Sequence, residues 1–145
     1  MAIKGAMRIG VPFETVFPFG AQCLGIHAEL DFDKKKEGAQ DPQKRDKETG
    51  ERMWVVRTVD LDETSFKGQA EQGVKVAAPV QPVVPARQDP NFPPLVWFDG
   101  LTLTPYTTNA GRQAYSIRAT GLRAPTSDEL EVIAGNVAAA RAAVG

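Results

Sequence analysis

The chain of 145 residues carries 17 Lys and Arg against 18 Asp and Glu, a formal net charge of −1, and 42% of its residues are hydrophobic. These values are typical of a single soluble globular domain that can bury a core without disulfides or metals. The near-neutral charge argues against strong, diffuse attraction to duplex DNA or to an anionic membrane.

The N-terminal segment, MAIKGAMRIG, contains no long apolar run and does not have the pattern of a signal peptide. No stretch approaches the roughly 18 consecutive apolar residues of a membrane span. The single cysteine, Cys23, excludes an internal disulfide. We therefore expect a soluble, cytoplasmic protein that does not contact a membrane.

Strand signals open the chain. Met7–Val16 and Gln22–Phe32 are predicted as strands. The second segment has the period-2 alternation of a half-buried strand, in Leu24, Ile26, Ala28 and Leu30. The next segment, Asp33–Gly50, is rich in charges and is predicted to be a long exposed loop or hairpin tip.

The middle of the chain contains the clearest strand, Arg52–Asp60, which is rich in β-branched and aromatic residues. Thr64–Gln72 is polar and predicted to be a loop. Val74–Ala78 is predicted as a short strand. The strand is expected to end at Pro79, because proline cannot donate to a β-ladder. The residues Pro79–Pro94 are therefore predicted to form a proline-rich connection.

Two further strands precede a helix. Leu95–Pro105 is predicted as a strand with a bulge or bend at Gly100, and after a turn Arg112–Gly121 alternates as a strand. Thr126 is the expected N-cap of a helix reaching Ala143, and Glu129 completes a capping box. An apolar stripe at spacings of three and four marks this helix, in Leu130, Ile133 and Val137.

Several short strands, breaks at proline and glycine, and one terminal helix predict a mainly β fold. We expect a five-stranded, OB-like Greek-key barrel with long loops over residues 1–125. Residues 126–145 are expected to form a C-terminal helix or tail.

The strongest candidate site combines Trp54 with Lys47, Arg52 and Arg57. Cations that follow phosphates, together with an aromatic ring that stacks on a base, are the means by which proteins hold single-stranded nucleic acid. Trp54 shares its strand face with polar residues, so we expect that face to be exposed. The alternative is that Trp54 is a core residue and the charges form a solvated loop.

A second candidate group lies near the end of the predicted strands. Arg112 and Arg118 share one strand face, Tyr106 lies at a strand end and is expected to be accessible, and Tyr115 is expected in the core. Lys75, on a strand expected at the edge of the sheet, is a further candidate for phosphate binding.

Other polar and aromatic groups favour structural interpretations. The basic run Lys34–Lys36 is expected to be solvated, and at least one ring of Trp97 and Phe98 is expected in the core. The acidic trio lacks the ligand spacing of a known cation loop and is expected to be a solvated strand end, at Asp60, Asp62 and Glu63.

Catalysis is not expected. Cys23 and His27 would be roughly 13 Å apart on one strand, too far for a nucleophile and its base. The sequence has no phosphate-binding glycine loop, zinc spacing or nucleophile elbow. We expect a non-enzymatic protein without cofactor or metal.

The order of these features resembles a known group. A charged loop ending in Lys47-Glu48-Thr49-Gly50 precedes Trp54-Val55-Val56, then Val74-Lys75-Val76 and a proline-rich break. This layout, over roughly Gln22 to Arg123, resembles the small single-stranded-DNA-binding proteins of actinobacterial plasmids and integrative conjugative elements. These are in turn similar in layout to the filamentous-phage single-strand-binding proteins, which are OB-fold dimers.

The resemblance implies cooperative, sequence-tolerant binding of single-stranded DNA, with RNA as the second choice, by a barrel face in replication or transfer of a mobile element. A homodimer is expected. The alternative is a protein-interaction module that uses the proline-rich segment 79–94 or the C-terminal helix, and a third possibility is a structural or capsid-associated β protein. The helix after Thr126 is not part of the phage pattern.

Overall fold

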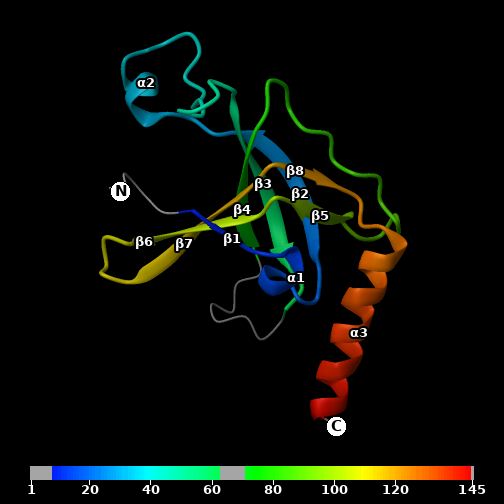
Figure 1. Ribbon diagram of the computed structural model, residues 1–145. Helices are drawn as coiled ribbons and strands as arrows, with labels where there is room; N and C mark the ends of the chain where they lie inside the picture. Colours follow the sequence, from blue (N-terminus) through cyan, green and yellow to red (C-terminus); the bar gives the residue numbers. More distant parts are fainter. Residues whose placement is uncertain (1–7, 63–70, 145) are drawn as a thin grey trace.

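The computed structural model describes residues 8–62 and 71–144 of the chain (Figure 1). The fold is mainly β, as expected: the described strands form one curled, open sheet that resembles half of a barrel, and a helix follows at the C-terminal end. The strands are β1 (Ile9–Gly10), β2 (Ala21–Ala28), β3 (Met53–Asp60), β4 (Glu71–Ala77), β5 (Leu95–Asp99), β6 (Thr102–Thr107), β7 (Gln113–Ala119) and β8 (Gly121–Arg123). The helices are α1 (Phe13–Val16), α2 (Phe32–Lys36) and α3 (Ser127–Val144).

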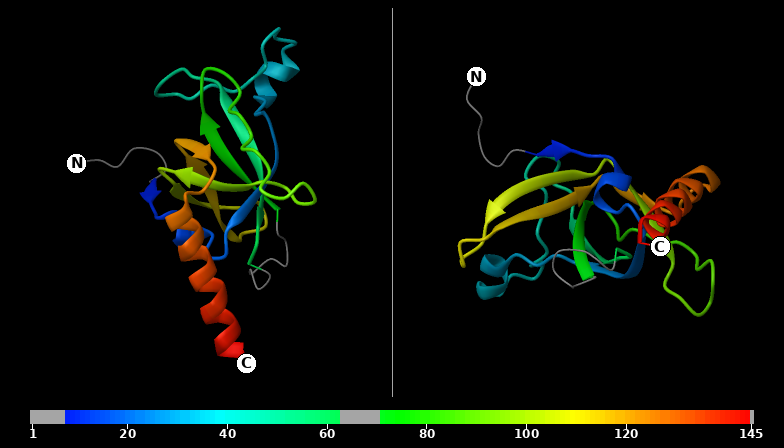
Figure 2. Two further views of the ribbon diagram at one scale, coloured as in Figure 1. Left: turned by 90° about the vertical axis from the view of Figure 1, so that its right-hand side faces the viewer. Right: turned by 90° about the horizontal axis from the view of Figure 1, so that it is seen from below.

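The strand order in the sheet is β1-β6-β7-β4-β3-β2-β5-β8. β4 and β7 pair in parallel, and the other neighbouring strands pair antiparallel. Figure 2 shows the strong curl of this sheet and the hairpin of β6 and β7, which extends beyond the rest of it. The curl places α1 against the core side of β5.

The predicted count of five strands is wrong, because eight strands are found in the described part of the chain. The predicted strand Leu95–Pro105 is divided into β5 and β6 at Gly100, where φ is +60° and the chain bends. A second bend separates β7 from β8 at Thr120, whose amide and hydroxyl both donate to the carbonyl of Asp99 at 2.9 and 3.0 Å. The two bends face each other across one long hairpin.

The predicted strand Met7–Val16 is also wrong over most of its length, and Met7 itself lies outside the described residues. Pro12 precedes α1, where its missing N–H costs nothing, and the Phe17 amide donates to the Phe13 carbonyl at 2.8 Å. This single turn places both phenyl rings in the core, and that of Phe13 stacks on Trp97 at 4.1 Å between centroids. Burial of these rings outweighs the strand pattern.

A β-bulge corrects the predicted alternation in Gln22–Phe32. The register between β2 and β3 shifts between Cys23 and Gly25, so Cys23 is buried while Leu24 is exposed. β2 ends at Ala28, and the predicted strand end belongs instead to α2. An extra residue in one strand turns every following side chain of that strand to the opposite side of the sheet.

The segment between β2 and β3, called here the excursion 29–52, has more structure than the expected loop. Asp31 caps α2 by accepting from the Asp33 and Lys34 amides at 3.0 and 3.4 Å. Antiparallel bridges join Leu30 to Gln43 and Arg45 to Arg52. The excursion is therefore an ordered, twisted hairpin that carries α2 away from the sheet (Figure 1).

The predicted loop Thr64–Gln72 lies outside the described residues up to position 70, and its last two residues belong to β4. β4 is thus longer than the predicted strand Val74–Ala78. β7 matches the predicted Arg112–Gly121 closely, whereas β8 was not predicted.

The C-terminal helix was predicted correctly, including its capping box. The Thr126 amide donates to Glu129 Oε1 at 2.8 Å, and the Glu129 amide donates to Thr126 Oγ1 at 3.2 Å. Ile133 is buried against the body of the protein, and Asn136 Nδ2 donates to the Pro18 carbonyl at 2.9 Å. Beyond this contact α3 extends away from the sheet (Figure 1). Within residues 8–62 and 71–144, no helix has the length and apolar character needed to span a membrane.

The core lies on the concave side of the sheet. Both Trp97 and Phe98 are buried there, as expected for at least one of them. The strands contribute mainly valine, which suits a curled and closely packed sheet. The largest fully buried side chains are Phe17, Phe98, Val56, Val74, Val76, Val96, Thr58 and Cys23.

Candidate nucleic-acid interface

The convex side of the sheet collects cations from three neighbouring strands, and we call Arg57, Lys75 and Arg118 the cationic face. Lys75 on β4 lies in register with Arg118 on β7, and Arg57 on β3 lies opposite Gly73 of β4. Paired residues point to the same side of a sheet, as do alternate residues along a strand. Val74, between Gly73 and Lys75, is fully buried on the other side. The three cations therefore share the outer surface.

The hairpin of β6 and β7 extends this surface with an aromatic ring. Tyr106 lies opposite Ala114, and Ala114 points to the same side of β7 as Arg118. The surface of Tyr106 is 51% exposed. Arg112, in the turn that joins the two strands, is exposed and forms no ion pair with any residue that the structure describes. Tyr106 thus adds a stacking surface beside the cations.

The expectation that Tyr115 is a core residue is wrong. It shares a strand face with buried Ile117, as the parity predicted, yet 54% of its surface is exposed. The β6–β7 hairpin projects beyond the body of the protein (Figure 1), so the core-side face of the strand becomes free at its outer end. The hairpin therefore presents one tyrosine on each of its two faces.

The expectation that the Trp54 face is exposed is wrong as well. Trp54 shares its face with Val56 and Thr58, both fully buried, so this is the core side of β3. The indole is half-buried at the end of the core, and its Nε1–H donates to the Ala78 carbonyl at 2.9 Å. Arg57 and Trp54 consequently lie on opposite sides of the strand.

Each cation of the cationic face is already paired with a carboxylate. Such pairs lower the local positive potential until a stronger anion replaces the carboxylate. The pairs are Arg57 Nε with Glu71 Oε1 at 2.8 Å, Lys75 Nζ with Glu29 Oε1 at 3.0 Å, and Arg118 Nη2 with Asp46 Oδ1 at 3.0 Å.

Asp46 is the most buried of these acids. Its side chain is 3% exposed, and its Oδ2 accepts from the Thr49 amide at 3.2 Å and the Thr49 hydroxyl at 2.9 Å. Burial by itself raises the pKa of this carboxyl, but the hydrogen bonds from Thr49 and Arg118 outweigh burial and lower the pKa to about 2. The turn that follows closes at Gly50, with φ +75°. Asp46 thus fixes the excursion 29–52 to β7.

Glu29 occupies a similar position over β4. Its Oε1 lies 3.0 Å from Lys75 Nζ and 3.6 Å from Lys44 Nζ. Its Oε2 is buried and has no hydrogen-bond partner among the residues that the structure describes, which is an unfavourable state for a charged oxygen. Glu29 and Asp46 of the excursion therefore cover adjacent cations of the sheet.

The remaining candidates from the predicted loop divide into two kinds. Arg52 is held by Asp41 Oδ2 at 2.8 Å and by Gln43 Oε1 at 2.9 Å, and its hydrogen bond lowers the pKa of Asp41. Lys47 is exposed at the turn and has no ion pair within the described ranges. Arg52 is therefore a structural residue of the excursion, and Lys47 is an accessible cation.

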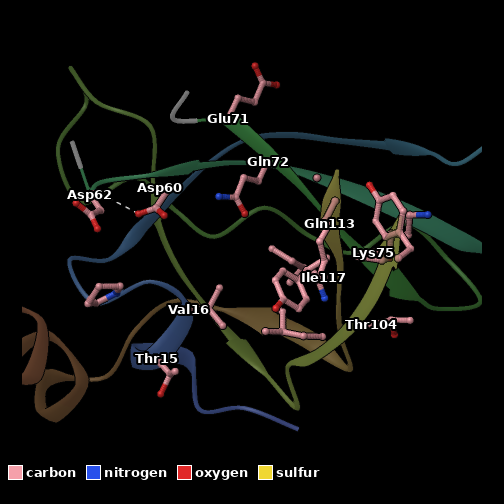
Figure 3. A pocket seen from close by; sticks show the side chains of 17 residues that line it. Thr15, Val16, Asp60, Asp62, Glu71, Gln72, Lys75, Thr104, Gln113 and Ile117 are labelled. Atoms are coloured by element: carbon pink, nitrogen blue, oxygen red, sulfur yellow. Dashed lines mark hydrogen bonds between the residues drawn. The ribbon is translucent and has the colours of Figure 1, made fainter. Parts of the chain in front are cut away.

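Beside the cationic face, β4 and β7 separate and leave an open cleft of about 1080 Å³ (Figure 3). The two strands pair over 74–76 and 117–119, and the cleft lies before this pairing. Gln72 points from β4 into the cleft, whereas Glu71 points away from it. Lys75 and Tyr106 also line this cleft, so it opens onto the cationic face.

Two groups were expected from the sequence to be solvated, and this expectation is wrong for Asp60. The run Lys34–Lys36 belongs to α2, away from the cationic face (Figure 1). Asp60 is buried and its Oδ1 accepts from the Asp62 amide at 2.9 Å, whereas Glu63 lies outside the described residues. Among the residues placed by the structure, His, Cys, Asp and Glu side chains form no group of three that could hold a metal ion.

Some of these residues were not found from the sequence. Asp46, followed at three and four positions by Thr49 and Gly50, has the pattern of a side-chain-capped turn and could have been recognised. Glu29 and Gln72 carry no such local signal, because their roles depend on neighbours from other strands.

Comparisons with protein-family models, curated proteins and solved structures gave no match for this chain. The resemblance to plasmid-borne single-strand-binding proteins therefore stays a prediction. Function has to be inferred from the cationic face and the neighbouring cleft.

Proposed function

We propose that this protein binds single-stranded nucleic acid, DNA in the first place, along its cationic face without catalysing a reaction. The observation that carries the proposal is the juxtaposition of Lys75 and Arg118 on adjacent strands, with Arg57 and exposed Tyr106 on the same side. Cations in a row can follow a phosphate backbone, and an exposed ring beside them can stack on a base.

The connectivity of the strands supports the finer proposal of an OB-like Greek-key barrel. If β5 with β6, and β7 with β8, are each counted as one bent strand, and the two-residue strand β1 is set aside, five strands remain. β2, β3 and β4 then form a meander, β4 pairs in parallel with the last strand, and β2 pairs with β5. This is the order of neighbours expected of a five-stranded barrel that binds oligonucleotides.

In this proposal the stacking role passes from Trp54 to the tyrosines of the β6–β7 hairpin. The Trp54 indole is half-buried and its N–H is already bonded to Ala78. Tyr106 and Arg112 are exposed on the projecting hairpin. Lys47 is the corresponding accessible cation of the excursion.

The test is fluorescence anisotropy with a labelled 30-nucleotide oligo-dT, over a range of salt concentrations. Wild type should bind at low salt, and the log–log slope against salt should be about −0.7 for each phosphate contact. Lys75→Ala should weaken binding and reduce the slope by about 0.7, because one contact is lost. Tyr106→Ala should weaken binding with an unchanged slope, whereas Tyr106→Phe should retain it.

Arg112→Ala, which breaks no ion pair in the described structure, provides a second test if Lys75→Ala folds poorly. Lys36→Ala is the matched control, since Lys36 is an exposed cation on α2. Failure of wild type to bind at micromolar protein and low salt would refute the proposal. Equal weakening by Lys36→Ala would refute the assignment to the cationic face.

The resemblance extends the proposal to a cytoplasmic homodimer that acts in replication or transfer of a mobile element. Sedimentation equilibrium with and without oligo-dT tests the dimer. A monomer in both conditions would refute the proposed homodimer without bearing on the proposed binding face.

The rival function is protein interaction through the proline-rich segment 79–94. Val83 and Phe92 expose 84% and 57% of their surfaces there, and the segment contains no strand or helix. An extended, apolar, proline-rich segment suits recognition by an aromatic-lined groove. Failure of wild type to bind oligo-dT at low salt and micromolar protein would favour this second function for the chain.

A further inference from the structure

The cleft between β4 and β7 has a mouth and an interior of different chemistry, because it passes from the outer surface towards the core. Lys75 and Tyr106 line its mouth on the cationic face. Ile117, Leu103 and Val16 of α1 form an apolar inner part. The cleft is therefore a passage from a surface suited to phosphates to an interior suited to a flat apolar ring.

The walls add aromatic and amide groups. Tyr115 lines the cleft on the face opposite Tyr106, with about half of its surface exposed. Gln72 and Gln113 contribute side-chain amides, and Gln72 points into the space (Figure 3). In the part of the chain that the structure describes, the side-chain amide of Gln72 has no hydrogen-bond partner. It is free to bond to a ligand.

The end of the cleft farthest from Lys75 is acidic (Figure 3). Asp60 and Asp62 lie there, beside the inward-pointing Gln72 (Figure 3). Asp60 is buried, and this burial raises the pKa of its carboxyl. Carboxylates repel phosphate but accept hydrogen bonds from amino groups. A ligand with both groups would thus place its phosphate near Lys75 and its amino group towards Asp60.

We propose that this cleft receives one unstacked nucleobase of the bound strand and favours a base with an exocyclic amino group, such as cytosine or adenine. Tyr115 provides the stacking surface, and Gln72 and Asp60 bond to the base edge. Amide side chains pair with adenine and carboxylates accept from the cytosine amino group, whereas thymine has no such group. This inference rests on the proposed function and adds a base preference to it.

The experiment compares labelled 30-nucleotide oligo-dC and oligo-dT at pH 7.5, where cytosine is neutral, with wild type and Gln72→Leu. Wild type should bind oligo-dC about tenfold more tightly than oligo-dT, as expected for one well-formed base contact. Gln72→Leu should lose most of this preference and leave binding of oligo-dT unchanged. Tyr115→Ala should weaken both oligonucleotides, and Tyr115→Phe should restore binding.

Gln113→Leu, on the opposite wall of the cleft, gives a second reading if Gln72→Leu disturbs folding. Equal affinity of wild type for oligo-dC and oligo-dT would overturn the base pocket while leaving single-strand binding intact. Unchanged binding of both oligonucleotides by Tyr115→Ala would overturn it too. Failure of wild type to bind either oligonucleotide would instead refute the proposed function.

Discussion

At the scale of single residues, Asp46 shows how a polar side chain can organise a surface. Its carboxylate is buried, bonds to Thr49 within its own turn, and pairs with Arg118 on a strand distant in sequence. A buried carboxylate is costly unless its lone pairs are satisfied, and here two donors from Thr49 and one from Arg118 satisfy them. The same residue therefore shapes the turn and determines where the excursion 29–52 lies.

Asp46→Asn should lower the free energy of unfolding by about 1–3 kcal/mol at pH 7, the range for a hydrogen-bonded charged group. Folding lowers the pKa of Asp46 to about 2. Its contribution is therefore present above the ordinary pKa near 4 and is lost as the pH falls towards 2. Urea unfolding of both proteins at pH 7 and pH 2.5 measures the difference, which should shrink at the lower pH.

Asp33→Asn is the matched control, since Asp33 is an exposed acid on α2. It should change stability by less than about 0.5 kcal/mol. A difference between wild type and Asp46→Asn that stays constant from pH 7 to 2.5 would contradict the assigned role of the carboxylate.

At the scale of elements, the long hairpin of β5 to β8 is bent where Gly100 and Thr120 meet. A Cβ atom at position 100 would lie 2.6 Å from Thr120 Oγ1, and φ there is +60°. The bend allows β5 to pair with β2 while β7 pairs with β4. Gly100 thus positions the β6–β7 arm and its tyrosines relative to the cationic face.

Gly100→Ala should destabilise the protein by about 2–4 kcal/mol, because backbone strain and steric overlap add. Gly111→Ala is the matched control: its φ is +78°, but nothing lies within 4 Å of the added Cβ. It should cost about 1–2 kcal/mol from the backbone alone. Thermal unfolding of both variants separates the cost of backbone strain from the cost of steric overlap. Equal losses of stability would show that contact with Thr120 does not matter.

At the scale of the whole molecule, the net charge of −1 hides a local arrangement. Cations of β4 and β7 face outward, and acids at positions 29 and 46 of the excursion cover them. A bound strand would have to exchange carboxylates for phosphates at these positions. Affinity should therefore depend on the acids of the excursion as well as on the cations of the sheet.

Glu29→Gln should strengthen binding of oligo-dT by about two- to fivefold at low salt, because it removes a charge beside Lys75 and Lys44. Anisotropy titration measures this effect. Glu37→Gln makes the same change in net charge at the C-cap of α2 and should alter affinity little. An equal gain in both variants would indicate a general charge effect, not release of Lys75.

The features that depend on local chemistry could be predicted from the sequence alone. The capping box of α3, the bend at Gly100, the strand 53–60 and the mainly β class all follow from short-range patterns, and the structure confirms them. Such signals are reliable because each one concerns groups that are close in the chain.

Which side of each strand faces water could not be predicted, because it depends on how the strands pack in three dimensions. Parity grouped Trp54 with Thr58, and Tyr115 with Ile117, but it could not say which group is buried. A bulge at Cys23 reversed one face, and a hairpin longer than the core exposed another. The cleft, and the acids that cover the cations, likewise exist because strands distant in sequence meet, and no local pattern encodes that meeting.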